Sequence, residues 1–572
     1  MDTRFAKSAY RFFALWGILT SLAMTVCTIV DALLIGNLVG SDGLAVTNMA
    51  TPVFLTFALF GIMLGVGASV KIGRALGASE IDEANRVFRS LLGAGLLVGV
   101  VCWIPLLFRD AFFGFLGVTE ELKPLAKEYM TVVLWSAPVF VLYHILSAAV
   151  RTDSDPKRAA AASAVVIVVN FFLDLLFMMV LKWGILGASA SLCIAECCGV
   201  LVLLRHFHKK RALLVLNFTL PKPREIGSFA VNGFGMGSAY IFQALSMLFF
   251  NNLLVRYGQA NAAMYVAIFG VIYSASMLPF AFYDGASNAL STITAFFLGE
   301  SDVDGIHSVL REALQLVLIA GAVIALACFF FARQIAGLFG LPPEVAAGTA
   351  ATAIRVFSVS ILFTGINTVT TAFWQTIGRA GLAGAMSLLR NLLLILLIGF
   401  GLIARRQIVG LSIAYICTEV LCTILVLVVR CVSGSMTYLR NTCNPPERVF
   451  ENQYTIQTGS MEQISGDLER IGEEWDIPMK RTLIINFICE ELLLNIIKFG
   501  LEDAKKEHYI AIKLMEQDDD YILRIRDNVR SFNPFETEGD AIDNGVLTLI
   551  QKKSKRYDYQ RKMIFNYLYM VI

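Results

Sequence analysis

Residues 168–177 read Val-Val-Asn-Phe-Phe-Leu-Asp-Leu-Leu-Phe, an apolar run that holds one amide, Asn170, and one carboxylate, Asp174. A spacing of four residues on a helix puts both side chains on one face, within reach of each other or of a shared ion. A carboxylate inside a membrane span is costly unless it faces a cavity or a partner, and such acids are functional by default. We therefore predict an all-α membrane fold in which Asp174 has a functional role.

The composition supports a chain that crosses the membrane many times. Of its 572 residues 57% are apolar and only 16% are charged, against roughly a quarter charged in soluble proteins, and the mean hydropathy is +0.67. Apolar stretches near the ~20 residues that a bilayer demands predict twelve transmembrane helices, near 12–36, 45–72, 87–108, 127–149, 159–181, 184–205, 227–254, 262–290, 307–331, 349–374, 381–403 and 408–430.

Charge and cysteine usage narrow the function further. The net charge is +2 and no basic tract with interleaved aromatics occurs, so we expect no nucleic-acid partner. The eleven cysteines lie mostly in apolar runs without ligand spacing, which favours helix packing over disulfides or metal binding. Lys and Arg gather in the even-to-odd connections, such as 205–211, so the positive-inside rule predicts a multi-pass protein of the cell membrane with both termini cytoplasmic.

An internal repeat organises these spans. Leu76–Asp82 recurs as Leu298–Asp304, and Asn170 recurs as Asn391, at offsets near 222 residues. Two six-helix lobes, 1–220 and 221–440, are therefore predicted. Each lobe has an even number of spans, so both run in the same direction, with the repeat axis along the membrane normal and a substrate cavity between the lobes.

The repeat also distinguishes acidic residues that occur in both lobes from those that occur in only one. Glu196 and Glu419 occupy equivalent places, which favours a part in the repeated architecture and makes them weaker cavity candidates. Asp174 and Asp31 occur only in the first lobe, as a single ion site would. Asp284 is likewise unrepeated and is a weaker candidate in the second lobe.

The chain changes character after a linker at 441–448. From 449 to 572 charge rises and no span-length apolar run remains. We predict a cytoplasmic α+β domain with a helix over 463–485, an amphipathic helix over 490–499, and a strand pair at 510–515 and 521–526.

The first 440 residues resemble the multidrug and toxic compound extrusion (MATE) transporters. The matching pieces follow one another in order: Val30–Gly36, Leu76–Ala78, Asp155–Arg158, Asn170 with Asp174, and Gly184–Ala188. The resemblance implies a transporter, not an enzyme, that exports small organic, often cationic, compounds in exchange for H⁺ or Na⁺, without a cofactor. It also implies that Asp31, Asn170 and Asp174 form the ion or proton-coupling site.

One departure concerns this site. Many members of the family place a Thr where this chain has Leu192, next to Ser191, which is a further weak candidate. The choice between H⁺ and Na⁺ therefore stays open. The hypothesis for coupling is that protonation of Asp174 and Asp31 rearranges the first lobe and expels substrate, because a carboxylate gains and loses protons as its surroundings change.

The carboxy-terminal domain resembles the GHKL ATP-binding fold, in the version used by anti-sigma-factor serine kinases. Glu490–Asn495 looks like the N box, in which Asn495 would hold Mg²⁺ and Glu491 would stand at the place of the general base. Asp527 opens a stretch like the G1 box, whose Asp reads adenine, and Gly545 stands where the G2 box would be.

This second resemblance is degenerate. Val529 and Leu547 replace glycines that let the backbone approach a nucleotide, and Phe499 replaces the small or polar end of the N box. Mg-ATP binding stays possible under the resemblance, but a domain that binds a cytoplasmic regulator protein fits better than a working kinase.

Three functions remain open from the sequence. The favoured one is a secondary exporter with a regulatory tail. The second is a flippase for a lipid-linked precursor, which is disfavoured because the spans contain few cations beyond Arg355 and Arg390. The third is a membrane-tethered sensor whose tail binds or phosphorylates a regulator.

Overall fold

The computed structural model describes residues 4–116, 118, 120–209, 212–339, 341–433, 438–439, 448–457, 459–497, 508–517, 520–530 and 554–572. Contacts divide the chain into two compact units. The larger is Ala6–Asn441, and the smaller is Thr442–Ile572 together with the first five residues.

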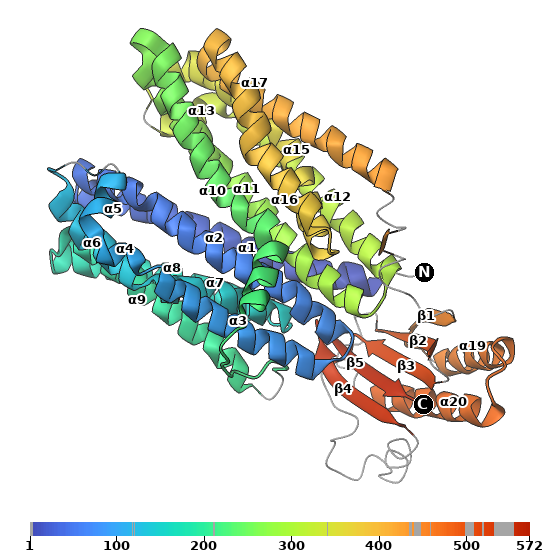
Figure 1. Ribbon diagram of the computed structural model, residues 1–572. Coiled ribbons are helices and arrows are strands. Elements are labelled where there is room, and N and C mark those ends of the chain that lie inside the picture. The colour runs from blue at the N-terminus through green and yellow to red at the C-terminus, as the bar shows by residue number, and fades with distance from the viewer. Residues whose placement is uncertain are drawn as a thin grey trace. The chain divides into compact units, whose positions relative to one another are not determined.

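The larger unit is a helical bundle (Figure 1). Its first half contains α1 (Arg4–Leu38), α2 (Ser41–Gly77), α3 (Ile81–Val101), α4 (Ile104–Leu107), α5 (Arg109–Phe115), α6 (Lys123–Trp135), α7 (Ala137–Thr152), α8 (Pro156–Asp174), η1 (Leu175–Val180), α9 (Gly184–Leu204) and η2 (Arg205–His208). Its second half contains α10 (Pro223–Gly258), η3 (Gln259–Asn261), α11 (Ala262–Gly299), α12 (Val303–Phe330), α13 (Ala332–Leu338), α14 (Pro343–Val345), η4 (Ala346–Ala350), α15 (Ala351–Thr376), α16 (Ala380–Leu388), η5 (Leu389–Leu393) and α17 (Leu394–Ser433).

Every span expected from the sequence is mainly helical, but the helices begin and end at other residues than the predicted spans do. Among the described residues ten helices are long and apolar enough to cross a membrane, and the pair α6 and α7, bent by 45°, makes up to eleven. One of the ten, Ala380–Val432, covers two expected spans. Gln407 lies in it with a non-helical φ of 47°, and Gly410 packs against Leu402, so the chain turns back there. The count of twelve stays a prediction.

The two halves of the bundle meet at one end through α2 and α11. A Cβ built on Gly77 would lie 2.0 Å from the carbonyl oxygen of Phe296, and one built on Gly299 would lie 1.9 Å from that of Arg74. Arg74 and Gly77 are the repeat counterparts of Phe296 and Gly299 at an offset of 222 residues. The two contacts are therefore equivalent, as expected around a pseudo-twofold axis between α2 and α11. We call this end of the bundle the closed end.

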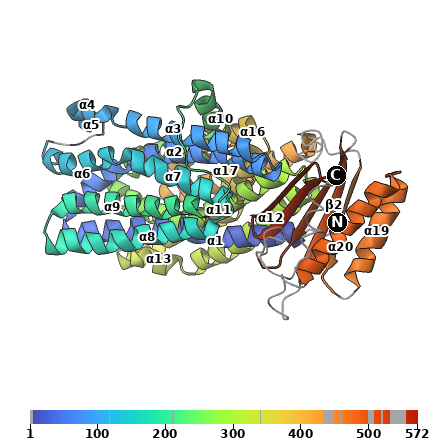
Figure 2. The ribbon, with the colours of Figure 1, turned by 90° about the horizontal axis from the view of Figure 1, so that it is seen from below.

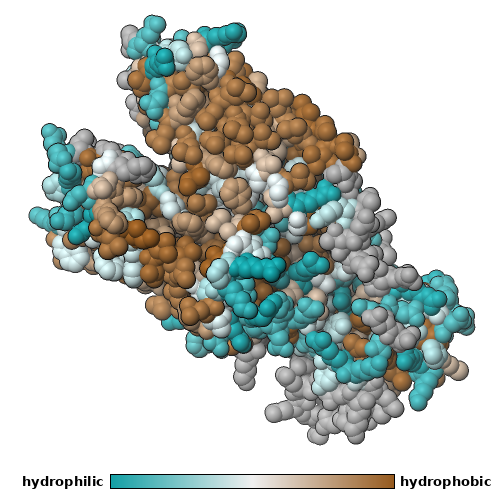
Figure 3. Space-filling model, in the orientation of Figure 1, coloured by the Kyte–Doolittle hydropathy of each residue, from teal (hydrophilic) through white to brown (hydrophobic). Residues whose placement is uncertain are grey.

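The halves separate away from the closed end. Figure 1 shows α2 and α10 diverging toward the opposite end, and Figure 3 shows the surface hollowed between the two groups of helices there. Apolar side chains cover much of the outer surface on either side of the hollow, as expected for a lipid-facing bundle. The bundle is thus a two-lobed structure, sealed at one end and open at the other.

The smaller unit has five antiparallel strands in the order β1-β2-β3-β5-β4, with two helices. Its elements are β1 (Val449–Thr455), α19 (Ser460–Glu474), α20 (Met479–Asn495), β2 (Tyr509–Gln517), β3 (Asp520–Asp527), β4 (Arg556–Lys562) and β5 (Phe565–Val571). Alternate residues of the strands, among them Ile510, Ile512, Leu523 and Ile525, form one core with α19 and α20. The expected strand pair is confirmed as β2 and β3.

The helices of this unit differ from the prediction. The single helix expected over 463–485 is wrong, because α19 ends at Glu474 and α20 begins at Met479. Asp476 adopts a φ of 54°, and the ring of Pro478 cannot donate a backbone hydrogen bond, so the helix is interrupted there. The helix expected to start at 490 is the end of α20.

Candidate functional site

Three helices of the first lobe bring together the residues that the sequence singled out. Asn170 and Asp174 lie one turn apart on α8, and the Nδ2 of Asn170 donates to Asp174 Oδ2 (2.9 Å). The same Nδ2 donates to Asp31 Oδ1 on α1. The hydroxyl of Ser191 on α9 donates to Asp174 Oδ1. We call Asp31, Asn170, Asp174 and Ser191 the paired-acid site.

The local backbone places Asp174 at a change of helix type. Asp174 ends α8, and the next six residues form the π-helical turn η1. Such turns are rare and are frequent at functional sites, because the extra residue per turn redirects the side chains that follow. Figure 2 shows α8 and α9 side by side along the lobe, which is why Ser191 can reach the end of α8.

The paired-acid site is buried, and no Lys or Arg among the described residues forms a salt bridge with either of its acids. Asn170 and Asp174 are only 1% and 2% exposed. The carboxyl groups of Asp31 and Asp174 are within hydrogen-bonding contact of each other, and Asn170 Oδ1 is buried with no partner among the described residues. Two carboxylates this close cannot both carry an uncompensated charge, so the arrangement suits a proton or a small cation held between them.

Two neighbours of this site were misjudged or missed from the sequence. Ser191, a weak candidate, is a direct partner of Asp174, whereas Leu192 packs into an apolar cluster with Ile185. Cys27 was missed, although it lies four residues before Asp31 on the same helix; its Sγ is 3.9 Å from Asp31 Oδ2. The four-residue spacing that identified Asn170 with Asp174 would also have identified Cys27.

Glu419 is held by a cation in the second lobe. Arg390 Nε donates to Glu419 Oε1 (2.8 Å), and Asn367 Nδ2 donates to Glu419 Oε2 (2.7 Å). Glu419 and Arg390 are 6% and 8% exposed. A buried carboxylate with both oxygens occupied in this way is suited to joining α15, η5 and α17 rather than to binding a transported ion.

Glu419→Gln is expected to destabilise the protein by about 3–5 kcal/mol, because removal of one partner leaves the buried Arg390 charge uncompensated. Thermal unfolding of the purified protein in detergent measures the effect. The double variant with Arg390→Gln should recover most of the loss. A single variant as stable as wild type would contradict the assigned role of this pair.

Glu196, the repeat counterpart of Glu419, is in a different environment. It is 2% exposed on α9, and its Oε2 has no hydrogen-bond partner among the described residues. The repeat therefore conserves the position of the acid but not its neutralising partner.

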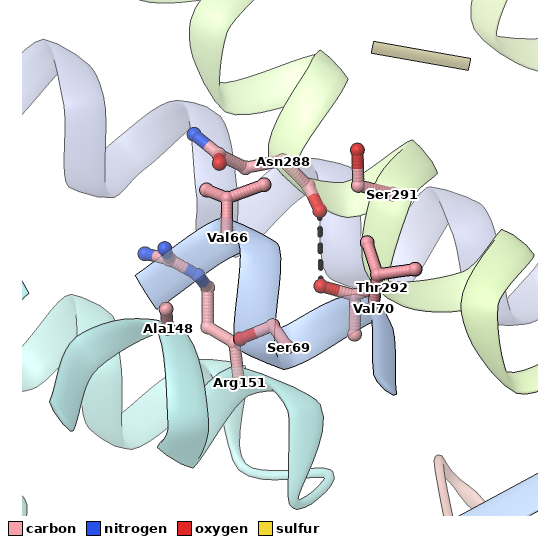
Figure 4. A pocket seen from close by; sticks show the side chains of 8 residues that line it. All are labelled: Val66, Ser69, Val70, Ala148, Arg151, Asn288, Ser291 and Thr292. Atoms are coloured by element: carbon pink, nitrogen blue, oxygen red, sulfur yellow. Dashed lines mark hydrogen bonds between the residues drawn. The ribbon is translucent and has the colours of Figure 1, made fainter. Parts of the chain in front are cut away.

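Asp284 lies apart from the paired-acid site, between the lobes. Its Oδ2 accepts hydrogen bonds from Ser21 Oγ of α1 (3.1 Å) and Asn288 Nδ2 of α11 (3.0 Å). A small pocket lies beside it between α2, α7 and α11 (Figure 4), lined by Val66, Ser69, Val70, Ala148, Arg151, Asn288, Ser291 and Thr292. The polar groups of this pocket, including Arg151, come from both lobes, so Asp284 belongs to the seam between them.

The residues expected to bind nucleotide lie on α20 and at the end of β3. Glu491 is half-buried, Asn495 is 7% exposed and Asp527 is 2% exposed. Asp527 Oδ1 accepts hydrogen bonds from Asn566 Nδ2 (2.8 Å) and from the backbone N–H of Val529 (3.2 Å). Gly545, Leu547 and Phe499 lie outside the described residues.

Asp527 is expected to make the stability of the smaller unit depend on pH. Burial raises the pKa of its carboxyl to about 7, against the opposing hydrogen bonds from Asn566 and Val529. The folded state therefore holds a proton that the unfolded state loses near pH 4, so stability falls as pH rises from about 4 to 7, by at most roughly 4 kcal/mol. Asp527→Asn should remove this dependence.

The pH dependence of this stability is measured by hydrogen exchange of peptides covering β3 and β5 in the full-length protein. The exchange rates are corrected for the intrinsic effect of pH. Equal protection at pH 5 and pH 8 in the wild type would contradict the expectation.

Comparison with known proteins agrees with this architecture. A family model described as MatE matches residues 17–176 and 236–400, one block in each lobe. Multidrug export protein MepA of Staphylococcus aureus (strain MRSA252) is 24% identical over 394 residues, covering 68% of this chain and 85% of that protein. Its namesake from Staphylococcus saprophyticus is 22% identical over 380 residues, covering 66% and 82%.

A solved structure shows the same fold. It is described as the outward-facing conformation of a multidrug resistance MATE family transporter of the MOP superfamily, and it matches with a TM-score of 0.71 at 22% identity over 76% of this chain and 97% of the other. The first matched block contains Asp31, Asn170 and Asp174, and the two blocks together with the two-lobed bundle show that the chain belongs to the MatE family of membrane transporters, whose members are not enzymes.

Proposed function

We propose that this protein exports small organic compounds, amphipathic or cationic, across the cell membrane in exchange for H⁺ or Na⁺. The observation that carries the proposal is the contact between the carboxyl groups of Asp31 and Asp174 inside one lobe, beside an oxygen of Asn170 that has no partner among the described residues. An ion that binds there changes the charge of the lobe interior. The relatives named as multidrug export proteins support the substrate class.

Coupling follows if the two orientations of the bundle hold the ion with different affinity, since a ligand shifts an equilibrium only by its differential binding. With a proton or cation bound, the two carboxyl groups of the paired-acid site do not repel each other, and the site joins α1, α8 and α9. When the ion leaves, the carboxylates of Asp31 and Asp174 repel each other and this packing is weakened. The lobes then change orientation, and substrate is taken up from the other side.

The hollow between the lobes is where we place the substrate (Figure 3). Asp284 lies in the seam between the lobes, where Ser21 and Asn288 donate hydrogen bonds to its carboxyl group. It is the acid of the second lobe that an organic cation in the hollow would approach.

Flux into and out of proteoliposomes tests the proposal. The probe is ethidium, an organic cation, and a pH gradient and a Na⁺ gradient are imposed separately. One of the two gradients should drive ethidium against its own concentration, and protein-free vesicles should show none. Absence of flux under both gradients, with protein inserted in both orientations, would overturn the exporter.

The smaller unit is proposed as a regulatory domain that binds a cytoplasmic protein rather than a kinase. In support, Asp527 is engaged by Asn566 and Val529, and the Val529 side chain fills the core where a nucleotide-binding glycine would leave room. Deletion after residue 445 should leave flux in proteoliposomes intact. Loss of flux would instead favour a sensor or a tail that is required for transport.

A further inference from the structure

One buried acid of the first lobe is not used by the coupling site described above. Glu196 is 2% exposed, and no described residue forms a hydrogen bond with its Oε2. Its counterpart Glu419 is neutralised by Arg390. Because Asn391 corresponds to Asn170 in the repeat, the place of Arg390 is taken in the first lobe by Val169. The first lobe thus keeps the carboxyl group and has replaced the cation with a hydrocarbon.

Glu196 lies beside the paired-acid site, on the side of the closed end. It follows Ser191 by five residues on α9, about 7.5 Å along the helix axis. Leu213, which lies beyond the end of α9, accepts a hydrogen bond from Asn85 near the start of α3. Because α3 begins just after Gly77, this hydrogen bond places the chain beyond α9 near the closed end. Glu196 is therefore the next acid along α9 between the paired acids and the closed end.

The groups around Glu196 can carry a proton, and no Lys or Arg among the described residues forms a salt bridge with it. The Cys27 thiol of α1 lies 3.9 Å from Asp31 Oδ2 and also interacts electrostatically with Asp174 and Glu196. Glu196 also acts on Tyr143 of α7, whose hydroxyl is 2.7 Å from Ser163 Oγ on α8. Two further titratable residues that Glu196 acts on, Cys193 and Cys197, are on its own helix.

We propose that Glu196 is a proton relay between the Asp31–Asp174 pair and the closed end of the bundle, and that the coupling ion is therefore H⁺. This rests on the proposed function. A buried carboxyl without a cation is stable only as the neutral acid. In the relay, Glu196 gives up its proton toward the closed end when that end opens, and then accepts the proton shared by Asp31 and Asp174. The pair is left anionic and Glu196 is neutral again, so one proton crosses per cycle.

Glu196→Gln tests the relay, because the amide keeps the shape of the side chain and cannot release a proton. Two fluxes of ethidium are compared in proteoliposomes: transport driven by a pH gradient, and exchange of labelled for unlabelled ethidium without any gradient. The variant should lose at least about tenfold in gradient-driven transport and keep wild-type exchange, since exchange needs no net proton movement. Glu196→Asp, which can still titrate, should recover part of the gradient-driven rate.

Thermal unfolding separates this result from a folding defect. Glu196→Gln should be at least as stable as wild type, since the carboxyl that it removes has an Oε2 without a hydrogen-bond partner among the described residues, whereas Glu419→Gln should be less stable. Wild-type pH-driven flux in Glu196→Gln would overturn the relay, and so would loss of both fluxes, which would show a role in the conformational change itself. A wild type driven by Na⁺ alone would overturn the relay and leave the exporter standing, whereas a wild type without flux would refute the exporter.

Discussion

Asp174→Asn is expected to abolish ion-coupled transport while the protein still folds. The new amide could still accept the hydrogen bond from Ser191, but it cannot ionise, so the charge of the site no longer changes when an ion arrives or leaves. Gradient-driven ethidium flux should fall by about 100-fold, near the upper end of the coupling between two ligand sites. Asp31→Asn should have a similar effect, because the two carboxyl groups act as one site.

The control is Asp82→Asn, which removes an exposed acid from the same lobe, at the start of α3. It should transport at the wild-type rate. Expression and thermal unfolding of all variants are measured beside the flux. Coupled transport that persists in the Asp31→Asn, Asp174→Asn double variant at equal expression would show that the ion is carried elsewhere.

Replacing both glycines of the closed end, Gly77→Ala with Gly299→Ala, is expected to prevent the lobes from closing there. Each new methyl group would lie about 2 Å from a backbone carbonyl of the opposite helix, and a helix backbone cannot yield as a side chain can. Overpacking costs about 1–3 kcal/mol per site, so the two contacts together should lower the population of the closed arrangement by at least about 30-fold.

Ethidium flux should fall accordingly, and hydrogen exchange of peptides covering residues 74–85 and 296–305 should become faster. The matched control is Gly270→Ala on α11, where a Cβ would meet nothing within 4 Å. It should leave both flux and exchange unchanged. Full flux in the double variant would show that this glycine contact is not part of the transport cycle.

The candidate site was partly predictable because one of its contacts lies within a single helix. The spacing of Asn170 and Asp174 requires only a helix, and their hydrogen bond is found as expected. The contacts of Asp31 with Asn170 and of Ser191 with Asp174 depend on how three helices pack, which no spacing along one helix specifies. For the same reason the repeat located Glu196 and Glu419 at equivalent places but could not reveal that Arg390 neutralises only one of them.

In the smaller unit the limits were similar. Alternating apolar residues predicted β2 and β3, which form their core contacts on one face. The strands β4 and β5 carry several charged and aromatic residues, and the pairing of β5 with β3 joins residues more than thirty positions apart. The break between α19 and α20 depends on the backbone of Asp476 and on Pro478, and it was overlooked because the apolar pattern continues across it.

The order of residues was enough to specify a bundle of membrane helices in two related halves, with acids in one half that the other lacks. These properties follow from hydrophobicity, helical spacing and repetition, all of which can be read along a single chain. The folded bundle was needed to show which acid has a partner, where the lobes touch, and that Ser191 and Cys27 adjoin the paired acids. Those features depend on distances between helices far apart in the chain, and a carboxyl group in a nonpolar interior acquires its chemistry from whichever neighbours the packing brings to it.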